Sequence, residues 1–428
     1  MRRILLFILL ALLYSCSPIS KSVLKKKFTV AEQNFNDHIG FALYDPALKK
    51  TIFEYQSDRY FTPASNTKIF TFFASLKLLG DSIPALYYTD RNDSLIVWGS
   101  GDPAFLYKNV FDNGRTFNFL KNQTLPLYFS ASNFYTTTFG SGWAWDDYNS
   151  AYSAERNSFP VYGNIISFQT DQRGYLIEPP FFKPFIKTGK RKEDGELIRE
   201  PGSNDFIFYP SLRKSKYQED VPFKTDSLLT VLLLKDTLHR DVGMVSRKIQ
   251  FDKKTLYSIP SDSLYKVMMQ QSDNFIAEQL LLICSGVITD SIKTEITIDY
   301  VKKNFLQDLT DEPMWVDGSG LSRYNLFTPR SVVQLWGKIY ELVPQQRLFE
   351  LLAVGGKPGT IKNYYKADKP YIFGKTGSLS NNHCLSGFLV TQKGKTLIFS
   401  FMNSNFTKPG SEVRNNMQQI LKTIYENY

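Results

Sequence analysis

Cysteine is scarce in this chain, because only three of its 428 residues are cysteines. Cys16, Cys284 and Cys384 lie far apart, and neither their spacing nor the nearby histidines make a zinc-binding motif. We therefore expect no metal site, and nothing in the sequence indicates another cofactor. Cys284 and Cys384 are expected to be buried free thiols, although an exported compartment would also permit a disulfide between them.

Histidine and long apolar runs are scarce as well. The only histidines are His38, His239 and His383, so a catalytic triad of serine, histidine and aspartate has little support. Residues 4–13 are almost wholly apolar, but a run of about ten residues is too short to cross the hydrocarbon core of a bilayer. Since no other stretch is longer and equally apolar, we expect no membrane-spanning helix.

The N-terminus has the pattern of a secretory signal peptide, because Arg2 and Arg3 precede the apolar run. Residues 13–16 read Leu-Tyr-Ser-Cys and resemble the lipobox of bacterial lipoproteins, in which the cysteine becomes the lipidated first residue. The pattern predicts a signal peptide over residues 1–15, lipid on Cys16 and a polar tether over residues 16–27. Such a protein would be exported and anchored to a membrane in the periplasm; ordinary signal cleavage nearby is the alternative.

Positive charge exceeds negative charge, and the formal net charge is +10. This charge is compatible with nucleic acid, an anionic membrane or an acidic cell-wall polymer as a partner. An exported protein seldom meets nucleic acid, so we expect no nucleic-acid partner. Scattered, solvated lysines are the simplest explanation of the charge.

The order of local patterns predicts an α/β (α+β) chain with a long insertion. Residues 38–55 have the pattern of a hairpin, and residues 68–79 that of a buried helix, because apolar side chains cover most of it. Residues 91–255 are rich in turns and short β-like runs, with a charged loop over residues 190–200. Helices return from residue 256 and are followed by strands and a last helix.

Serine is a poor nucleophile at neutral pH and needs a base. A lysine three residues later on a helix can supply it, because one helical turn brings its amine to the same face. The Ser-x-x-Lys pattern begins at Ser22, Ser65, Ser211 and Ser263, but only Ser65 follows Pro-Ala and opens a long apolar helix. There the helix N-terminus stabilises negative charge, and burial favours a neutral lysine, so Ser65 and Lys68 are the predicted nucleophile and base.

Two further motifs follow Ser65. Ser272-Asp273-Asn274 begins an apolar helix, where serine can relay a proton and asparagine can bind a substrate amide, although such residues are also common helix caps. Lys-Thr-Gly occurs at residues 187–189, in a charged region, and at residues 375–377, after a strand-like run. Only the later copy is expected to line a strand edge, where lysine and threonine bind a carboxylate and glycine allows close approach.

In this order the three motifs form the set shared by class A β-lactamases and penicillin-binding proteins. The stretch between Ser65 and Ser272 is longer than a compact β-lactamase allows. More of the chain resembles the class C penicillin-binding proteins, the D-alanyl-D-alanine carboxypeptidase/endopeptidase family. The resemblance runs through residues 63–68, 101–103, 142–147, 317–323, 359–360 and 374–379.

This resemblance implies a β-lactamase/transpeptidase-like domain, an antiparallel sheet flanked by helices, built from residues 28–90 and 256–428. Residues 91–255 would be a β-rich insertion, and because all three motifs lie outside it, we expect its function to be separable from the chemistry. The implied reaction is hydrolysis of D-Ala-D-Ala peptides of peptidoglycan through an acyl-enzyme. β-Lactam antibiotics would be covalent inhibitors.

The same resemblance assigns roles to the motif residues. Ser65, Lys68 and Ser272 would be catalytic. The residues that would bind the substrate are Asn274, Lys375, Thr376, Gly377 and Ser378, with the lysine and threonine on its terminal carboxylate. The backbone N–H groups of Ser65 and Ser378 would form the oxyanion hole.

Two alternatives remain open. A serine β-lactamase shares the acylation chemistry, but we find no clear glutamate for rapid deacylation, and the insertion also argues against it. A non-catalytic cell-wall-binding lipoprotein of the same fold would not need Lys68 beside Ser65. The sequence does not distinguish carboxypeptidase from endopeptidase preference.

Overall fold

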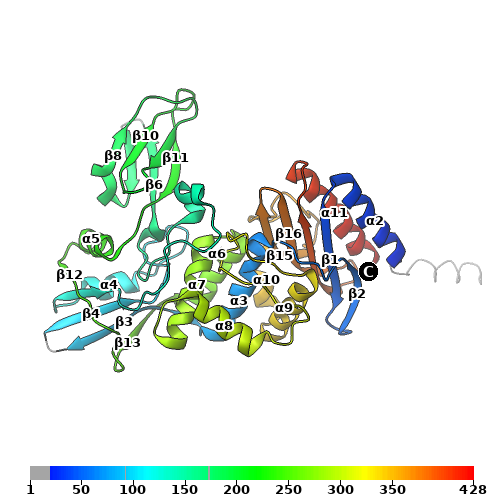
Figure 1. The fold of residues 1–428 in the computed structure, drawn as a ribbon, viewed down its shortest axis with the longest axis horizontal. Helices are drawn as coiled ribbons and strands as arrows, with labels where there is room; N and C mark the ends of the chain where they lie inside the picture. Colours follow the sequence, from blue (N-terminus) through cyan, green and yellow to red (C-terminus); the bar gives the residue numbers. More distant parts are fainter. Residues whose placement is uncertain (1–19, 92, 172–173) are drawn as a thin grey trace, which may run out of the picture.

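The computed structural model describes residues 20–91, 93–171 and 174–428, so the expected signal peptide and Cys16 lie outside the described residues. The molecule is elongated, with a six-stranded sheet at one end and the inserted strands at the other (Figure 1). A group of helices lies between them. Within the described ranges, no helix combines the length and the apolar character needed to cross a membrane.

The six-stranded sheet joins the beginning of the described chain to its end. Its order is β14-β15-β16-β17-β1-β2, and every neighbouring pair is antiparallel. The predicted hairpin is β1 and β2, and β1 pairs with the C-terminal strand β17. The strands are β1 (His38–Asp45), β2 (Lys50–Tyr55), β14 (Ala353–Val354), β15 (Ile372–Leu379), β16 (Asn382–Val390) and β17 (Thr396–Ser404).

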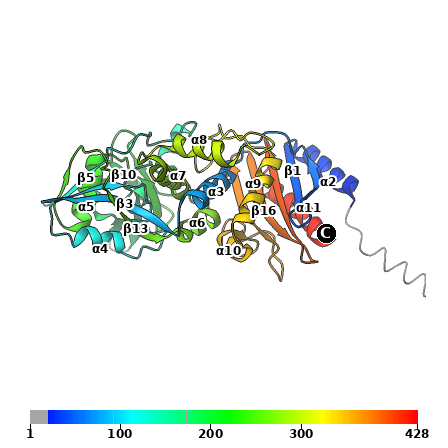
Figure 2. The same ribbon diagram turned by 90° about the horizontal axis from the view of Figure 1, so that it is seen from below.

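Two helices, α2 (Lys21–Phe35) and α11 (Gly410–Asn427), cover one face of this sheet (Figures 1 and 2). Phe28 of α2 is fully buried, and its ring centroid lies 5.3 Å from that of Phe401 in β17. Residues 21–27, expected within a polar tether, are therefore the first turns of a helix, because the apolar side of this segment packs on the sheet.

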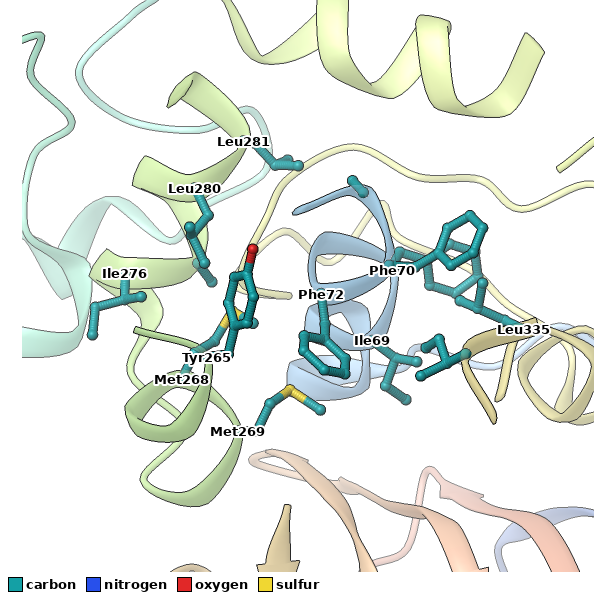
Figure 3. Packing of buried hydrophobic residues seen from close by; sticks show 14 of the residues in the cluster. Ile69, Phe70, Phe72, Tyr265, Met268, Met269, Ile276, Leu280, Leu281 and Leu335 are labelled. Carbon is teal, nitrogen blue, oxygen red and sulfur yellow. The ribbon is translucent and has the colours of Figure 1, made fainter. Parts of the chain in front are cut away.

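The helices on the other face include two that begin at motif residues, α3 at Lys68 and α7 at Asn274. The helices on this face are α3 (Lys68–Leu78), α6 (Ser261–Gln270), α7 (Asn274–Thr289), α8 (Thr294–Phe305), α9 (Pro329–Leu342) and α10 (Gln345–Leu351). Residues 68–75 of α3 are all buried, as predicted for this helix. Figure 3 shows Phe72 on the side of α6, where its ring centroid lies 5.4 Å from that of Tyr265, while Leu335 of α9 lies on the opposite side. Lys68 thus begins a helix whose first two turns are buried on all sides.

Three smaller sheets form the inserted region, with the orders β12-β5-β4-β3-β13, β11-β6-β7 and β8-β10-β9. Their elements are β3 (Ser82–Arg91), β4 (Ser94–Gly99), α4 (Arg115–Lys121), β5 (Leu127–Ser130), β6 (Ile165–Asp171), β7 (Gly174–Glu178), β8 (Ile186–Thr188), β9 (Glu196–Arg199), β10 (Phe206–Tyr209), β11 (Gln218–Pro222), α5 (Ser227–Leu238), β12 (Val242–Met244) and β13 (Lys254–Pro260). This confirms the expected α/β (α+β) class with a β-rich insertion.

The ends of the insertion are two paired strands. The expected limits, between residues 90 and 91 and between residues 255 and 256, fall inside β3 and β13. These strands are antiparallel, with Lys254 opposite Tyr88. Hydrogen bonding therefore brings the two connections to the rest of the chain side by side, a pairing that the sequence alone did not reveal.

Residues 190–200 are not a simple charged loop. Residues 190–194 are exposed, but residues 196–199 form β9, in which Leu197 and Arg199 are buried. Arg199 Nε donates to the carbonyl of Pro222 at 2.9 Å. Side chains along a strand alternate between its two faces, so Arg199 points into the protein. The many charged residues around it in the sequence indicated a solvated loop and gave no sign of this burial.

Candidate active site

Ser65 lies in a short 3-10 turn, η1 (Ala64–Thr67), that leads directly into α3. Lys68 follows one turn later, and its Nζ donates to Ser65 Oγ at 2.9 Å. The same Nζ donates to Asn274 Oδ1 at 2.6 Å and to the carbonyl of Ser319 at 2.7 Å. Because an ammonium group has three N–H donors, these three acceptors satisfy it completely.

Burial lowers the pKa of Lys68 to about 8, and the negative charges of Asp317, Glu278 and Asp273 oppose this shift. Burial disfavours the charged form, because the low-dielectric interior solvates an ammonium poorly. A useful fraction of Lys68 is therefore neutral near neutral pH and able to accept a proton.

A second pair of lysine and serine lies across the site. Lys375 Nζ in β15 donates to Ser272 Oγ at 2.8 Å and to the carbonyl of Thr376 at 2.7 Å. Burial, together with the charge of Lys68, holds the pKa of Lys375 well below its usual range. Ser272 has a left-handed backbone, with φ of +65°, just before Asp273 caps α7 by accepting from the N–H of Ile276 at 2.9 Å.

The strand β15 is tied to η1 by buried contacts. Asn66 Nδ2 donates to the carbonyl of Lys375 at 3.0 Å, and Asn66 Oδ1 accepts from Ser386 Oγ at 2.6 Å. A methyl group added at Gly377 would lie 2.3 Å from the carbonyl oxygen of Pro63 and 3.0 Å from the nitrogen of Ser65. Only glycine lets the strand come this close, and the approach places β15 beside Ser65, as the predicted oxyanion hole requires.

The loop of residues 317–325 is held together by Asp317, to which the sequence analysis gave no individual role. Its carboxylate accepts from the backbone N–H groups of Gly320 and Ser322 at 2.8 and 2.7 Å, and from the indole of Trp143 at 3.0 Å. These hydrogen bonds fix the position of the Ser319 carbonyl, which accepts a hydrogen bond from Lys68 Nζ. The Asp-Gly-Ser-Gly-Leu-Ser-Arg stretch was the available signal for this loop.

Glu278 is a second residue that the sequence analysis missed. It lies one turn beyond Asn274 on α7, is buried, and accepts from the backbone N–H of Ser319 at 2.7 Å. Its other oxygen faces Arg156 Nη1 at 3.3 Å. Burial and the charge of Asp317 raise the pKa of Glu278 to about 7. Glu278 lies four residues after Asn274, a spacing that places the two side chains on the same face of a helix. The apolar sequence around it gave no further reason to select Glu278 as a site residue.

His383 does not support the triad considered from the sequence. Its Nδ1 lies 2.7 Å from Ser378 Oγ, so its hydrogen bond goes to the predicted substrate-binding residue rather than to Ser65. Burial, with help from Arg414 and Lys375, lowers the pKa of His383 to about 3. The ring is therefore neutral at physiological pH.

The other candidate motifs lie apart from this site. In the part of the chain that the structure describes, a Ser-x-x-Lys hydrogen bond between Oγ and Nζ occurs only at Ser65 and Lys68. Lys187, in the earlier Lys-Thr-Gly, is an exposed residue of β8, 3.9 Å from Asp205. Cys284 and Cys384 are buried free thiols.

Two cavities meet at Ser65 and Ser378. The first, of about 400 Å³, is lined by Ser65, Ala144, Asp146, Asp147, Tyr152, Asn274, Gly320, Leu321, Arg323, Ser378, Leu379 and Ser380. The second, of about 450 Å³, is lined by Ser65, Ser272, Thr360, Asn363, Tyr364, Thr376, Ser378, His383 and Arg414. Ser65 thus stands between a cavity lined by two aspartates and an arginine, and a cavity whose lining includes an arginine but no acidic residue.

Comparison with known proteins agrees with this geometry. The profile of the family described as D-Ala-D-Ala carboxypeptidase 3 (S13) matches residues 27–180 and 228–424. Penicillin-sensitive carboxypeptidase A of Dictyostelium discoideum is 22% identical over 445 residues, covering 86% of this chain and 83% of that protein. D-alanyl-D-alanine carboxypeptidase DacB of Haemophilus influenzae is 30% identical over 161 residues, covering 35% of this chain and 33% of that protein.

Solved structures share the fold. The crystal structure of penicillin-binding protein 4 from Haemophilus influenzae superposes with a TM-score of 0.74 at 20% identity, covering 93% of this chain and 98% of that chain. A predatory peptidoglycan endopeptidase from Bdellovibrio bacteriovorus superposes with a TM-score of 0.54 at 15% identity, covering 90% of this chain and 93% of that chain.

Gly377→Ala should slow acylation of Ser65 by a fluorescent penicillin roughly 100-fold, because the methyl group would push β15 away from Ser65 and open the oxyanion hole. Gly337→Ala in α9 is a matched control, since nothing lies within 4 Å of its added methyl group. Stopped-flow fluorescence would measure both rates. Equal slowing in the two variants would contradict this role of Gly377.

The acylation rate should rise with pH and level off above about pH 8, because Lys68 accepts a proton only when neutral and its pKa is lowered to about 8. Below that value, the neutral fraction and the rate should fall about tenfold per pH unit. The second-order rate constant for penicillin, measured from pH 6 to pH 10 on the free enzyme, tests this. A flat profile across that range would rule out Lys68 as the titrating base.

Proposed function

The chain belongs to the D-Ala-D-Ala carboxypeptidase 3 (S13) family, and from this premise we propose a role for each residue of its active site. It is a serine-type D-alanyl-D-alanine carboxypeptidase/endopeptidase, a hydrolase acting on peptidoglycan stem peptides. The proposed roles rest mainly on two hydrogen-bonded pairs of lysine and serine on either side of one site. These pairs are Lys68 with Ser65 and Lys375 with Ser272. The first pair suits a nucleophile with its base, and the second suits proton delivery to a leaving group.

Acylation begins when neutral Lys68 takes the proton of Ser65 Oγ, which attacks the carbonyl carbon of the penultimate D-alanine. The backbone N–H groups of Ser65 and Ser378 stabilise the negative charge that develops on the carbonyl oxygen. The C–N bond then breaks, and Ser272 relays to the departing amine the proton that Lys68 took from Ser65, so that Lys68 becomes neutral again. Water hydrolyses the resulting ester and frees Ser65 for another cycle.

The remaining motif residues hold the substrate. Asn274 binds the amide of the acyl part, while Lys375 and Thr376 bind the terminal carboxylate. A β-lactam would enter the same site and acylate Ser65, which supports penicillin as a covalent inhibitor. The family assignment supports a peptidase rather than a β-lactamase, and the Lys68–Ser65 hydrogen bond argues against a non-catalytic binding protein.

We also propose that the protein is exported to the periplasm and anchored by lipid on Cys16, as the pattern of residues 1–16 indicates. The position of α2 supports this arrangement. It lies at the end of the molecule opposite the insertion (Figure 1). If the chain is anchored to a membrane through Cys16, the insertion would therefore point away from that membrane.

Incubation with penicillin should give a covalent adduct on Ser65, located by peptide mapping and absent in Ser65→Ala. Lys375→Ala should slow this acylation by about 100-fold or more, because the pair of Lys375 and Ser272 is lost. Lys187→Ala, in the exposed Lys-Thr-Gly copy, should acylate normally. An adduct on Ser22, Ser211 or Ser263, or equal slowing in the two folded lysine variants, would be incompatible with the proposed roles.

Cys16→Ser should release the protein from membranes while leaving penicillin acylation of the soluble protein intact. The physical reason is that the apolar run before Cys16 is too short to anchor the chain by itself. Membrane fractionation of wild type and variant after a high-salt wash measures the release. A variant that still sediments with membranes would refute lipid on Cys16 as the anchor.

A further inference from the structure

The second cavity lies on the leaving-group side of Ser65, an assignment that rests on the proposed function. Ser272 and Thr376 line it, and these residues handle the departing amine and the terminal carboxylate. Its volume of about 450 Å³ falls in the range of about 300–1,000 Å³ typical of sites for drug-sized ligands. One alanine residue is far smaller, so the cavity has room for more than the D-alanine of a simple stem peptide.

Arg414 contributes the guanidinium of this cavity. The residue is half-buried on α11, and its Nε donates to Tyr364 Oη at 3.1 Å. Its guanidinium also lies over the Tyr364 ring, 5.6 Å from the centroid. These two contacts fix the orientation of the side chain. Among the residues that the structure describes, no carboxylate lies within ion-pair distance of Arg414.

The surroundings of Arg414 favour an anion. None of the described residues that line this cavity is acidic, whereas Asp146 and Asp147 line the first cavity. Lys375 beside Thr376 carries no negative charge in either protonation state, and the pKa of His383 is lowered to about 3, so neither residue supplies a counter-charge. A guanidinium presents a planar fork of donors that matches a carboxylate, and Tyr364 leaves the two Nη groups available for one.

We propose that Arg414, held by Tyr364, binds a second carboxylate in the leaving group and thereby determines specificity. Lys375 and Thr376 bind the carboxylate next to the scissile bond. Arg414 therefore binds a different carboxylate, farther along the leaving group. The favoured substrate is then a peptide whose leaving part is acidic and larger than D-alanine, such as the second strand of a cross-linked stem peptide. This extends the proposed function by naming the substrate class of one side of the site.

Three synthetic peptides test the inference. They share one acyl part ending in D-alanine and differ in the leaving residue, which is D-Ala, D-Gln or D-Glu. D-Gln and D-Glu have nearly the same shape, so their comparison isolates the charge. Wild type should hydrolyse the D-Glu peptide with kcat/KM about tenfold above the D-Gln peptide, the low end of a charge-assisted hydrogen bond because Arg414 is partly exposed.

Arg414→Gln should bring the ratio of D-Glu to D-Gln close to one, and Arg414→Lys, which keeps a positive charge, should retain part of the preference. Lys422→Gln is the matched control, because it removes one positive charge from the same helix at an exposed position outside the cavity. Its ratio should equal that of wild type. Thermal unfolding of each variant shows whether it is folded.

The inference is overturned if wild type hydrolyses the D-Glu and D-Gln peptides equally well, or if the preference survives in folded Arg414→Gln. The wild-type comparison decides the matter even if Arg414→Gln does not fold. Failure of the proposed function has a different signature, because wild type would then hydrolyse none of the three peptides and form no penicillin adduct on Ser65. That result would also remove the basis of the inference.

Discussion

The active site depends on the burial of one ammonium group, that of Lys68. Removing a charge from water costs several kcal/mol, which only well-placed partners offset. The three acceptors come from three distant parts of the chain: Ser65 in η1, Asn274 at the start of α7, and the Ser319 carbonyl in the loop after α8. The buried charge therefore holds Ser65, the second motif and the loop in one arrangement, since loss of any acceptor would leave a donor unsatisfied.

The second buried lysine makes this arrangement electrostatically demanding. Burial lowers the pKa of Lys375, and the nearby charge of Lys68 lowers it further. The negative charges of Asp317 and Glu278 partly offset the effect of burial on the pKa of Lys68. Burial in turn raises the pKa of Glu278, so this carboxyl group ionises less readily. The pKa of Lys68 falls to about 8 and that of Lys375 lies well below its usual range, so both lysines lose a proton more readily than an exposed lysine does. This suits the proposed movement of protons between Ser65, Ser272 and a substrate.

The sequence predicted those parts of the site that are local. Ser65 with Lys68, and the order of the three motifs, follow from spacing along the chain, and the structure brings these residues together. Glu278 and the pairing of β3 with β13 could not be predicted in this way, because they depend on contacts between distant segments. Arg199 was hidden for another reason, since its charge suggested a solvated loop whereas backbone carbonyls bind it inside a small sheet.

The insertion supplies no motif, yet it takes part in building the catalytic centre. The Tyr152 carbonyl accepts from Asn274 Nδ2 at 2.9 Å, which leaves Asn274 Oδ1 pointing at Lys68. Trp143 donates to Asp317, and Arg156 approaches Glu278, the two carboxylates behind Lys68. The expectation that the whole of residues 91–255 is separable from the chemistry therefore does not hold for its segment 143–156. Without that segment nothing from the insertion would hold the N–H₂ of Asn274 away from the ammonium, so the insertion helps to fix the orientation on which the proposed proton transfer from Ser65 depends.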